Sequence, residues 1–233
     1  MPLTPPLPLL YGDHVSQLLV DCHGVMLSAA TAQAFSAMQQ AALAQGINIM
    51  PCSGYRSFER QLHIWNGKAA GTRPLLDANE CPVDALSLSD DQLVETILLW
   101  SALPGASRHH WGTDVDVFDA QGISRADLQL VPSEYQAGGP CDALTHWLEQ
   151  HAARFGFFLP YQAGQSGVSA EPWHLSYAPQ AVAMLAHFNH DELYQRLKQS
   201  DLKLKAALLP RLEQIIATYV HHIAAPPQNL TIP

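Results

Sequence analysis

The chain has 233 residues, of which 48% are hydrophobic, and this is enough to bury the core of one compact domain. Charged residues make up only 14% and the formal net charge is −9, with no basic patch. This balance argues against nucleic acid as a partner and gives no help in binding anionic surfaces.

Cysteine spacing excludes further kinds of site. None of the four cysteines forms a C-x-x-C pair, which disfavours a cysteine zinc site and a redox motif. An even count permits two disulfides, but free or partly buried thiols are at least as compatible with a chain of this length. The residues concerned are Cys22, Cys52, Cys81 and Cys141.

Residues 1–27 predict an irregular or β-rich lead-in. The opening MPLTPPLPLLYGDH lacks a basic n-region and is interrupted by prolines, so it is a poor signal peptide. No run of about 18 apolar residues is present, so no membrane span is expected. These features by themselves predict a cytoplasmic protein.

The next segment predicts a helix, a strand and a second helix. Ser28 is a suitable N-cap for a helix that ends near Gly46. Residues 47–50 (INIM) predict a short strand, and a second helix is expected from about Ser57. Arg56 lies at this strand-to-helix junction, from which a side chain points into a site more readily than from the middle of a helix.

A long loop is expected at 67–88, because this stretch holds Gly, Pro, Asp and Asn without periodicity. Loops of this length often form the rim or lid of a functional site. Ser89 then caps a helix that is expected to run to about Ser101.

The second half of the chain predicts strands and then helices. Residues 112–118 alternate as a strand does, with Asp114 and Asp116 on one face. Asp142 is expected to cap a helix that Gly156 ends. Strands are expected at 157–159 and 173–177, followed by helices from Ala178 that Pro210 interrupts or starts.

Two separated segments carry the chemistry. His109, Asp116 and His174 offer two nitrogens and one oxygen to a single metal, and Glu171 lies three residues before the last of them. Three protein ligands leave a fourth position for water, which is typical of catalytic zinc sites. Gly112 allows the chain to turn, so that a loop histidine and a strand aspartate can converge.

The order of these residues resembles a known signature. The pattern Ser107-x-His109-x-x-Gly112-x-x-x-Asp116, followed by Glu171-x-x-His174, is similar to that of the zinc D-alanyl-D-alanine carboxypeptidases. These are the vancomycin-resistance-type D,D-carboxypeptidases and D,D-dipeptidases, which share a fold with the hedgehog signalling domain. The segments 53–57 (SGYRS) with Gln61, and 146–157, also resemble blocks of that family, and the likeness runs from about residue 30 to Tyr177.

The resemblance implies an α+β fold: a single domain with a small central antiparallel sheet flanked by helices. It places a catalytic domain at 28–177, after the 1–27 lead-in, and leaves 178–233 as a helical extension packed on the same domain. It implies one Zn²⁺ per chain and a substrate that ends in D-Ala-D-Ala.

The resemblance also implies roles for individual residues. Glu171 is the expected general base, and Arg56 is expected to stabilise the oxyanion. Substrate contacts are expected from Ser107, Gln61, Tyr55 and Trp173. Asp114 departs from the family, which usually has a small or apolar residue there, and it is a candidate to support a metal ligand from behind.

Several alternatives stay open at this point. His110 competes with its neighbour His109 as the ligand, although the Ser-x-His register favours His109. A D,D-dipeptidase, a peptidoglycan endopeptidase and a non-catalytic zinc-binding module are the alternative functions, and the presence of Glu171 and Arg56 favours an enzyme. The family implies the cell envelope where the missing signal implies cytoplasm, and the oligomeric state is not indicated.

Overall fold

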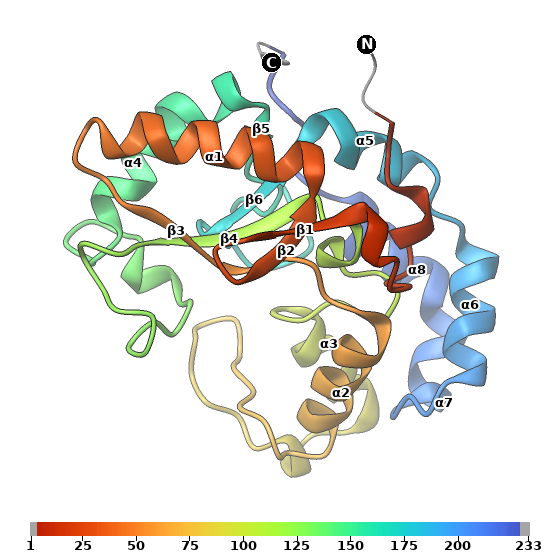
Figure 1. Ribbon diagram of the computed structural model, residues 1–233. Coiled ribbons are helices and arrows are strands. Elements are labelled where there is room, and N and C mark those ends of the chain that lie inside the picture. The colour runs from red at the N-terminus through yellow and green to blue at the C-terminus, as the bar shows by residue number, and fades with distance from the viewer. Residues whose placement is uncertain (1–3, 229–233) are drawn as a thin grey trace.

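A four-stranded antiparallel sheet lies at the centre of the fold, with helices on both sides of it (Figure 1). The computed structural model describes residues 4–228. The strand order is β3-β4-β6-β5, formed by β3 (Ile49–Ser53), β4 (Asp114–Asp119), β6 (His174–Tyr177) and β5 (Phe157–Phe158). A separate antiparallel pair joins β1 (Leu19–Cys22) to β2 (Val25–Ser28).

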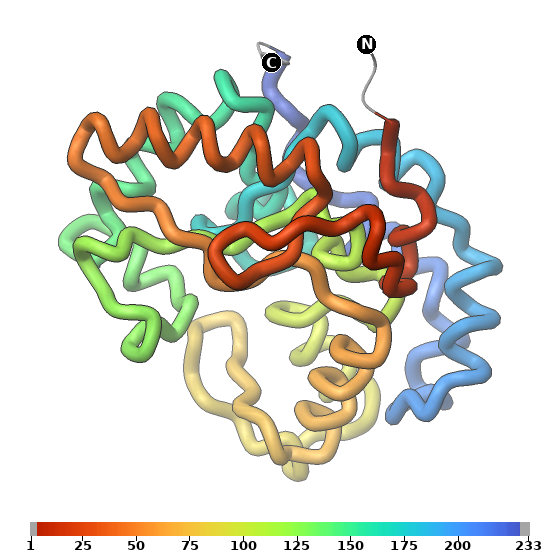
Figure 2. Tube along the Cα trace, in the orientation of Figure 1, coloured from red at the N-terminus to blue at the C-terminus, as the bar shows by residue number. Residues whose placement is uncertain are grey.

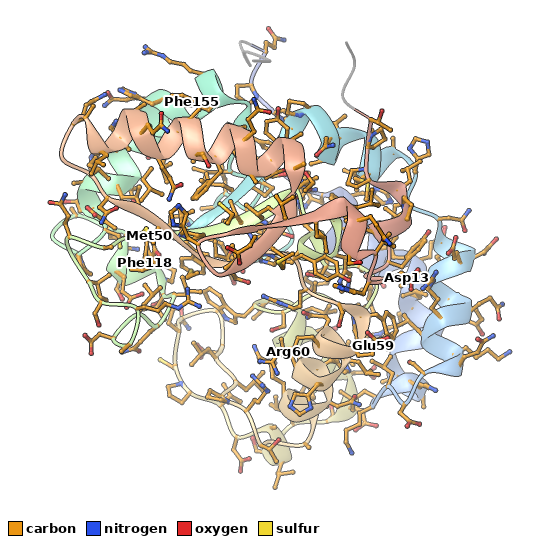
Figure 3. The ribbon with its side chains drawn as sticks, in the orientation of Figure 1. Asp13, Met50, Glu59, Arg60, Phe118 and Phe155 are labelled. Atoms are coloured by element: carbon orange, nitrogen blue, oxygen red, sulfur yellow. The ribbon has the colours of Figure 1, made fainter. Side chains whose placement is uncertain are left out.

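Helices α1 (Ala29–Leu43) and α4 (Asp142–His151) share one hydrophobic core with the sheet. The Ser28 hydroxyl accepts a hydrogen bond from the Thr31 amide at 3.3 Å and so caps α1. In β3 and β4, Met50 and Phe118 lie opposite each other at the edge of this core (Figure 3). Other members of the core are Phe35, Met38, Val115, Val117, Leu144, Trp147, Phe157 and Leu175.

A second core forms on the other side of the molecule. It combines α2 (Phe58–Ala69) and α3 (Asp90–Leu98) with helices from the end of the chain. These are α5 (Ala178–Ala186), α6 (His190–Gln199), α7 (Lys205–Leu208) and α8 (Leu212–Ile216), which a π-helical turn, Ala217–His221, continues. Trp65 of α2 is fully buried there, and its indole N–H donates to the Lys203 carbonyl at 3.1 Å.

Short 3₁₀ helices and a long loop complete the described chain. The loop between α2 and α3 lies on the same side of the sheet as those helices and is drawn in yellow in Figure 2. The 3₁₀ helices are Leu7–Leu9, Ser16–Leu18, Ala85–Ser87, Arg108–Trp111, Pro132–Glu134, Ala152–Phe155 and Leu209–Arg211.

Most of the expected elements are present, but their ends differ. The strand expected at 47–50 lies at 49–53, and the helix expected to reach Ser101 ends at Leu98. Asp142 is the first helical residue and not the cap: its carboxylate accepts from the Gly138 amide at 3.0 Å, while Cys141 occupies the N-cap position. All four cysteines are free thiols. Within residues 4–228, no helix has the length and apolar character needed to cross a bilayer.

Candidate metal centre

The register of the sheet brings the first functional groups together. Ser53 of β3 pairs with Asp116 of β4, and Asp116 pairs with His174 of β6. Directly opposite residues of antiparallel strands project to the same face. A row of three polar side chains therefore crosses the middle of the sheet, and Asp116 and His174 within it are buried.

His109 reaches this row from the 3₁₀ helix Arg108–Trp111. Gly112 ends that helix with φ of 66°, a left-handed conformation that favours glycine, and redirects the chain into β4. A Cβ atom at this position would also lie 2.9 Å from Leu19 Cδ2. The Arg56 amide donates to the His109 carbonyl at 3.1 Å, which ties the turn to the segment after β3.

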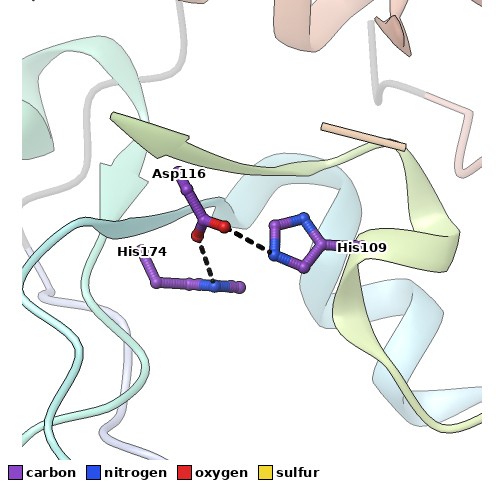
Figure 4. Close-up of side chains that lie close together, drawn as sticks. All are labelled: His109, Asp116 and His174. Atoms are coloured by element: carbon purple, nitrogen blue, oxygen red, sulfur yellow. Dashed lines mark ion pairs between the residues drawn. The ribbon is translucent and has the colours of Figure 1, made fainter. Parts of the chain in front are cut away.

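The three side chains converge on one point (Figure 4). His109 Nε2 lies 3.2 Å from Asp116 Oδ2, and His174 Nδ1 lies 3.1 Å from Asp116 Oδ1. One ligand atom from each residue falls within 4.8 Å of the others. His174 Nδ1 and Asp116 Oδ1 are buried and have no hydrogen-bond partner within residues 4–228. Buried polar atoms without a partner are rare in proteins and call for an explanation. Two imidazoles and one carboxylate that meet at one point fit the ligand set of a zinc ion with one open position.

A buried network behind the site orients His174. Its Nε2 lies 3.0 Å from Asp114 Oδ1, and the same oxygen accepts from Arg108 Nε at 2.8 Å. Arg108 also donates to the Ser176 hydroxyl at 2.6 Å, and Thr113 donates to the other Asp114 oxygen at 2.6 Å. Although burial opposes ionisation, Arg108 and His174 lower the pKa of Asp114 to about 2. The carboxylate therefore holds His174 with Nδ1 directed at the centre.

Glu171 is delivered by a tight turn. The His174 amide donates to the Glu171 carbonyl at 3.1 Å, with Pro172 at the second position, where its fixed φ favours a β-turn. Glu171 Oε2 lies 3.5 Å from His174 Nδ1. Burial raises the pKa of Glu171 to about 7, and the charge of His174 opposes that rise. A carboxyl group with this pKa can both accept and release a proton near neutral pH.

Arg56 is held in a fixed orientation beside the site. Its Nη1 donates to Gln61 Oε1 at 2.8 Å and its Nη2 donates to the Ser53 hydroxyl at 3.1 Å. Gln61 is itself fixed, because its amide nitrogen donates to the Ala102 carbonyl at 2.7 Å. Burial lowers the pKa of Arg56, and the nearby carboxylates of Asp116 and Glu171 act in the opposite direction.

His110 has a structural position. Its Nε2 accepts from the Gly105 amide at 2.9 Å, so the neutral ring donates from Nδ1 to the Arg56 carbonyl at 2.5 Å. Burial lowers its pKa to about 3. Both ring nitrogens are bound to backbone, and the potential metal site contains His109 and not His110.

A cavity of about 430 Å³ opens onto the site. It is lined by the three potential ligands, Glu171, Arg56, Ser107 and Trp173. Gln61 and Tyr55 do not line it: Gln61 is fully buried behind Arg56, and the Tyr55 hydroxyl donates to the Gly12 carbonyl at 2.9 Å. Substrate contacts by these two residues stay untested predictions.

The cavity also contains residues that the sequence did not single out. Lys68, Arg73 and Tyr161 line it, and the Tyr161 ring packs against His174 with ring centroids 4.8 Å apart. Helical spacing offered a signal for Lys68, because residues 61, 64 and 68 share one face of α2. Arg73 and Tyr161 lie in irregular segments, where no periodicity could have marked them.

The chain matches a known family over most of its length. The family model described as VanY, D-alanyl-D-alanine carboxypeptidase, matches residues 24–180. An uncharacterized Haemophilus influenzae protein is 40% identical over 121 residues, 51% of this chain and 92% of that protein. A D-alanyl-D-alanine carboxypeptidase of Enterococcus faecalis is 27% identical over 74% of this chain, and the match spans only 54% of that protein.

Solved structures show the same fold. VanYB in complex with D-alanine-D-alanine superposes with a TM-score of 0.53 at 23% identity, over 81% of this chain and 86% of that one. A VanB-type D,D-pentapeptidase VanY in complex with Zn(II) gives 0.52 at 23% identity, over 81% and 88%. The expected arrangement of a small antiparallel sheet flanked by helices is therefore confirmed.

Proposed function

The chain belongs to the VanY family of D-alanyl-D-alanine carboxypeptidases and is a metallopeptidase, and on this premise we propose that it is a zinc-dependent D,D-carboxypeptidase. Its substrates are peptidoglycan-type peptides that end in D-Ala-D-Ala, from which it releases the terminal D-alanine. One observation carries the proposal: His109, Asp116 and His174 meet Glu171 and Arg56 at a single cavity.

His109, Asp116 and His174 would hold one zinc ion per chain. When bound, zinc lowers the pKa of its water to roughly 7 and polarises the carbonyl under attack. The fit rests on the donor set and on the unsatisfied buried atoms His174 Nδ1 and Asp116 Oδ1. The Asp114 carboxylate fixes the tautomer of His174, because a hydrogen bond at Nε2 leaves the lone pair of Nδ1 for the metal.

Glu171 accepts the proton of the attacking water and then transfers it to the leaving amine. Its position beside His174 and its raised pKa support both steps. Arg56 stabilises the negative charge that develops on the carbonyl oxygen, and its bonds to Gln61 and Ser53 preorganise it for this task.

Ser107 and Trp173 are the proposed substrate contacts among the residues that line the cavity. Ser107 is 3% exposed, and among the described residues its hydroxyl has no hydrogen-bond partner, so it can donate to the substrate. Trp173 is 4% exposed and forms part of the wall. The non-catalytic alternative is less well supported, because such a module has no use for Glu171 and Arg56.

The test is release of D-alanine by the zinc-loaded protein. The substrates are a pentapeptide that ends in D-Ala-D-Ala, the same peptide with an L-Ala-L-Ala end, and the free D-Ala-D-Ala dipeptide. We expect turnover of the first only, and loss of turnover when a chelator removes the metal. Equal rates on both stereoisomers would refute the substrate class, and faster hydrolysis of the free dipeptide would indicate a D,D-dipeptidase.

A further inference from the structure

Besides Arg108, which is paired with Asp114, three cations line the catalytic cavity of a chain whose net charge is −9. Arg56 follows β3, Lys68 lies in the last turn of α2, and Arg73 follows in the loop after α2. They line the same cavity as Glu171 and the potential metal ligands. These three side chains give the cavity a locally positive potential, which attracts an anion. The negative net charge of the whole chain would by itself repel one.

Lys68 and Arg73 have no polar partner among the described residues. Both are half-buried, and within residues 4–228 neither side chain makes a hydrogen bond or an ion pair. Half-buried arginines elsewhere are paired: Arg196 contacts Asp13 and Glu192, and Arg211 contacts Glu95. Desolvated charges without a partner are costly, so these two cations are suited to an anion that arrives with a ligand.

The charges of Glu171 and Arg73 both act on Lys68. Burial lowers the pKa of Lys68 to about 8; Glu171 is the strongest charge that opposes this, and Arg73 and Arg56 add to the lowering. Glu171 in turn feels the charge of Lys68. Arg73 lies against the last turn of α2, which also holds Lys68, since a Cβ at Gly67 would come 2.8 Å from Arg73 Cδ. Lys68 is therefore near enough to both Glu171 and Arg73 to feel their charges, and all three residues line one cavity.

A carboxypeptidase substrate has an anion at the corresponding place. Glu171 protonates the leaving nitrogen, and the terminal carboxylate is attached to the Cα bonded to that nitrogen, within about one residue length of roughly 3.5 Å. Gln61 is unavailable to this carboxylate, because its oxygen and its nitrogen are both engaged inside the protein.

We propose that Lys68 and Arg73 form the subsite for the free carboxylate of the substrate's terminal residue. The inference rests on the proposed function and deepens it: the two cations select peptides with a free C-terminus over amidated or cross-linked ones. Lys68 supplies a compact charge near Glu171, and Arg73 supplies a planar fork of donors in the same cavity.

The experiment compares two substrates on matched variants. Acetylated peptides that end in D-Ala-D-Ala, as free acid and as C-terminal amide, are given to the zinc-loaded wild type, Lys68→Met, Arg73→Met and Lys68→Arg. Lys203→Met is the control, because it removes the same charge from an exposed position outside the cavity. Binding of both peptides is measured by calorimetry on Glu171→Gln, with and without Lys68→Met, so that the preference is read without turnover.

We expect the wild type to prefer the free acid. Lys68→Met should lower kcat/KM and affinity for the acid by roughly 10- to 100-fold, the range for a hydrogen bond to a charged group, and leave the affinity for the amide, measured on Glu171→Gln, unchanged. Arg73→Met should act in the same direction, Lys68→Arg should restore most of the preference, and zinc content should not change. Equal losses for acid and amide, or an unchanged ratio in both Met variants, overturn the subsite. If no peptide is hydrolysed but the acid still binds through Lys68, the subsite stands and the proposed function fails.

Discussion

Removing the Asp114 carboxylate should separate the stability of the fold from its affinity for metal. Asp114 is fully buried and contacts three side chains: Arg108, which is 3% exposed, His174 and Thr113. In Asp114→Ala the guanidinium of Arg108 loses its counterion inside the protein. His174 loses the acceptor for Nε2 and, with it, the constraint that directs Nδ1 toward Asp116.

Each loss has its own magnitude. An unpaired buried charge costs about 3–5 kcal/mol, which for a chain of this size lowers Tm by roughly 6–20 °C. The loss of a carboxylate partner behind a ligating histidine costs roughly 10- to 100-fold in metal affinity. The first effect needs Arg108 to be present, whereas the second does not.

The double variant Arg108→Met/Asp114→Ala distinguishes the two effects. It removes both members of the buried ion pair, and such replacements by apolar groups are often close to neutral for stability. Thermal unfolding of the metal-free proteins should therefore show most of the loss recovered. Competition with a chromophoric chelator should show zinc affinity as weak as in Asp114→Ala.

Two outcomes would refute this reasoning. If zinc affinity returns together with stability in the double variant, Asp114 acts through the fold and not through His174. If Asp114→Ala binds zinc as tightly as the wild type does, the orientation of His174 does not depend on the hydrogen bond at 3.0 Å.

Four further outcomes are expected. Glu171→Gln should keep its zinc by metal analysis while turnover falls roughly 10²- to 10⁴-fold, because the amide cannot accept the proton; loss of zinc would make Glu171 a ligand instead. Arg56→Ala should also keep zinc and lose roughly 10²- to 10³-fold in kcat. Arg56→Lys should recover only part of that kcat, because an ammonium cannot bond both Gln61 and Ser53 as the planar guanidinium does. The affinity for free-acid peptides should fall as pH rises through about 8, where Lys68 loses its proton beside Glu171, Arg73 and Arg56, and this fall should be absent in Lys68→Arg. The metal-free protein should lose stability, on the order of 4 kcal/mol, as pH falls from about 6.5 toward about 3. The reason is that His110 binds a proton in the unfolded chain but stays neutral in the folded one. If denaturant unfolding shows the same stability across this pH range, His110 is not buried as a neutral ring.

Local sequence determined the helices and the turns. Ser28, Ser57 and Ser89 each accept the amide of the residue three positions on, and this spacing is legible in the sequence. The turn that pairs Glu171 with His174 follows from Pro172, and the turn between His109 and Asp116 follows from Gly112. The predicted ends of β3 and β4 were less accurate, because the extent of a strand is set by its partner strands and not by local preference.

For the site, residue types and spacing predicted the three potential ligands, with Glu171 beside the last of them, and the family resemblance predicted Arg56. Only the tertiary structure decided between His109 and His110, since the two differ in which backbone groups their rings meet. It also placed Gln61 behind Arg56 and brought Lys68 and Arg73 to the cavity wall. Local spacing could specify the turns that present these side chains; contacts between residues distant in sequence, such as His174 with Asp114, exist only when the strands pair and the core closes around them.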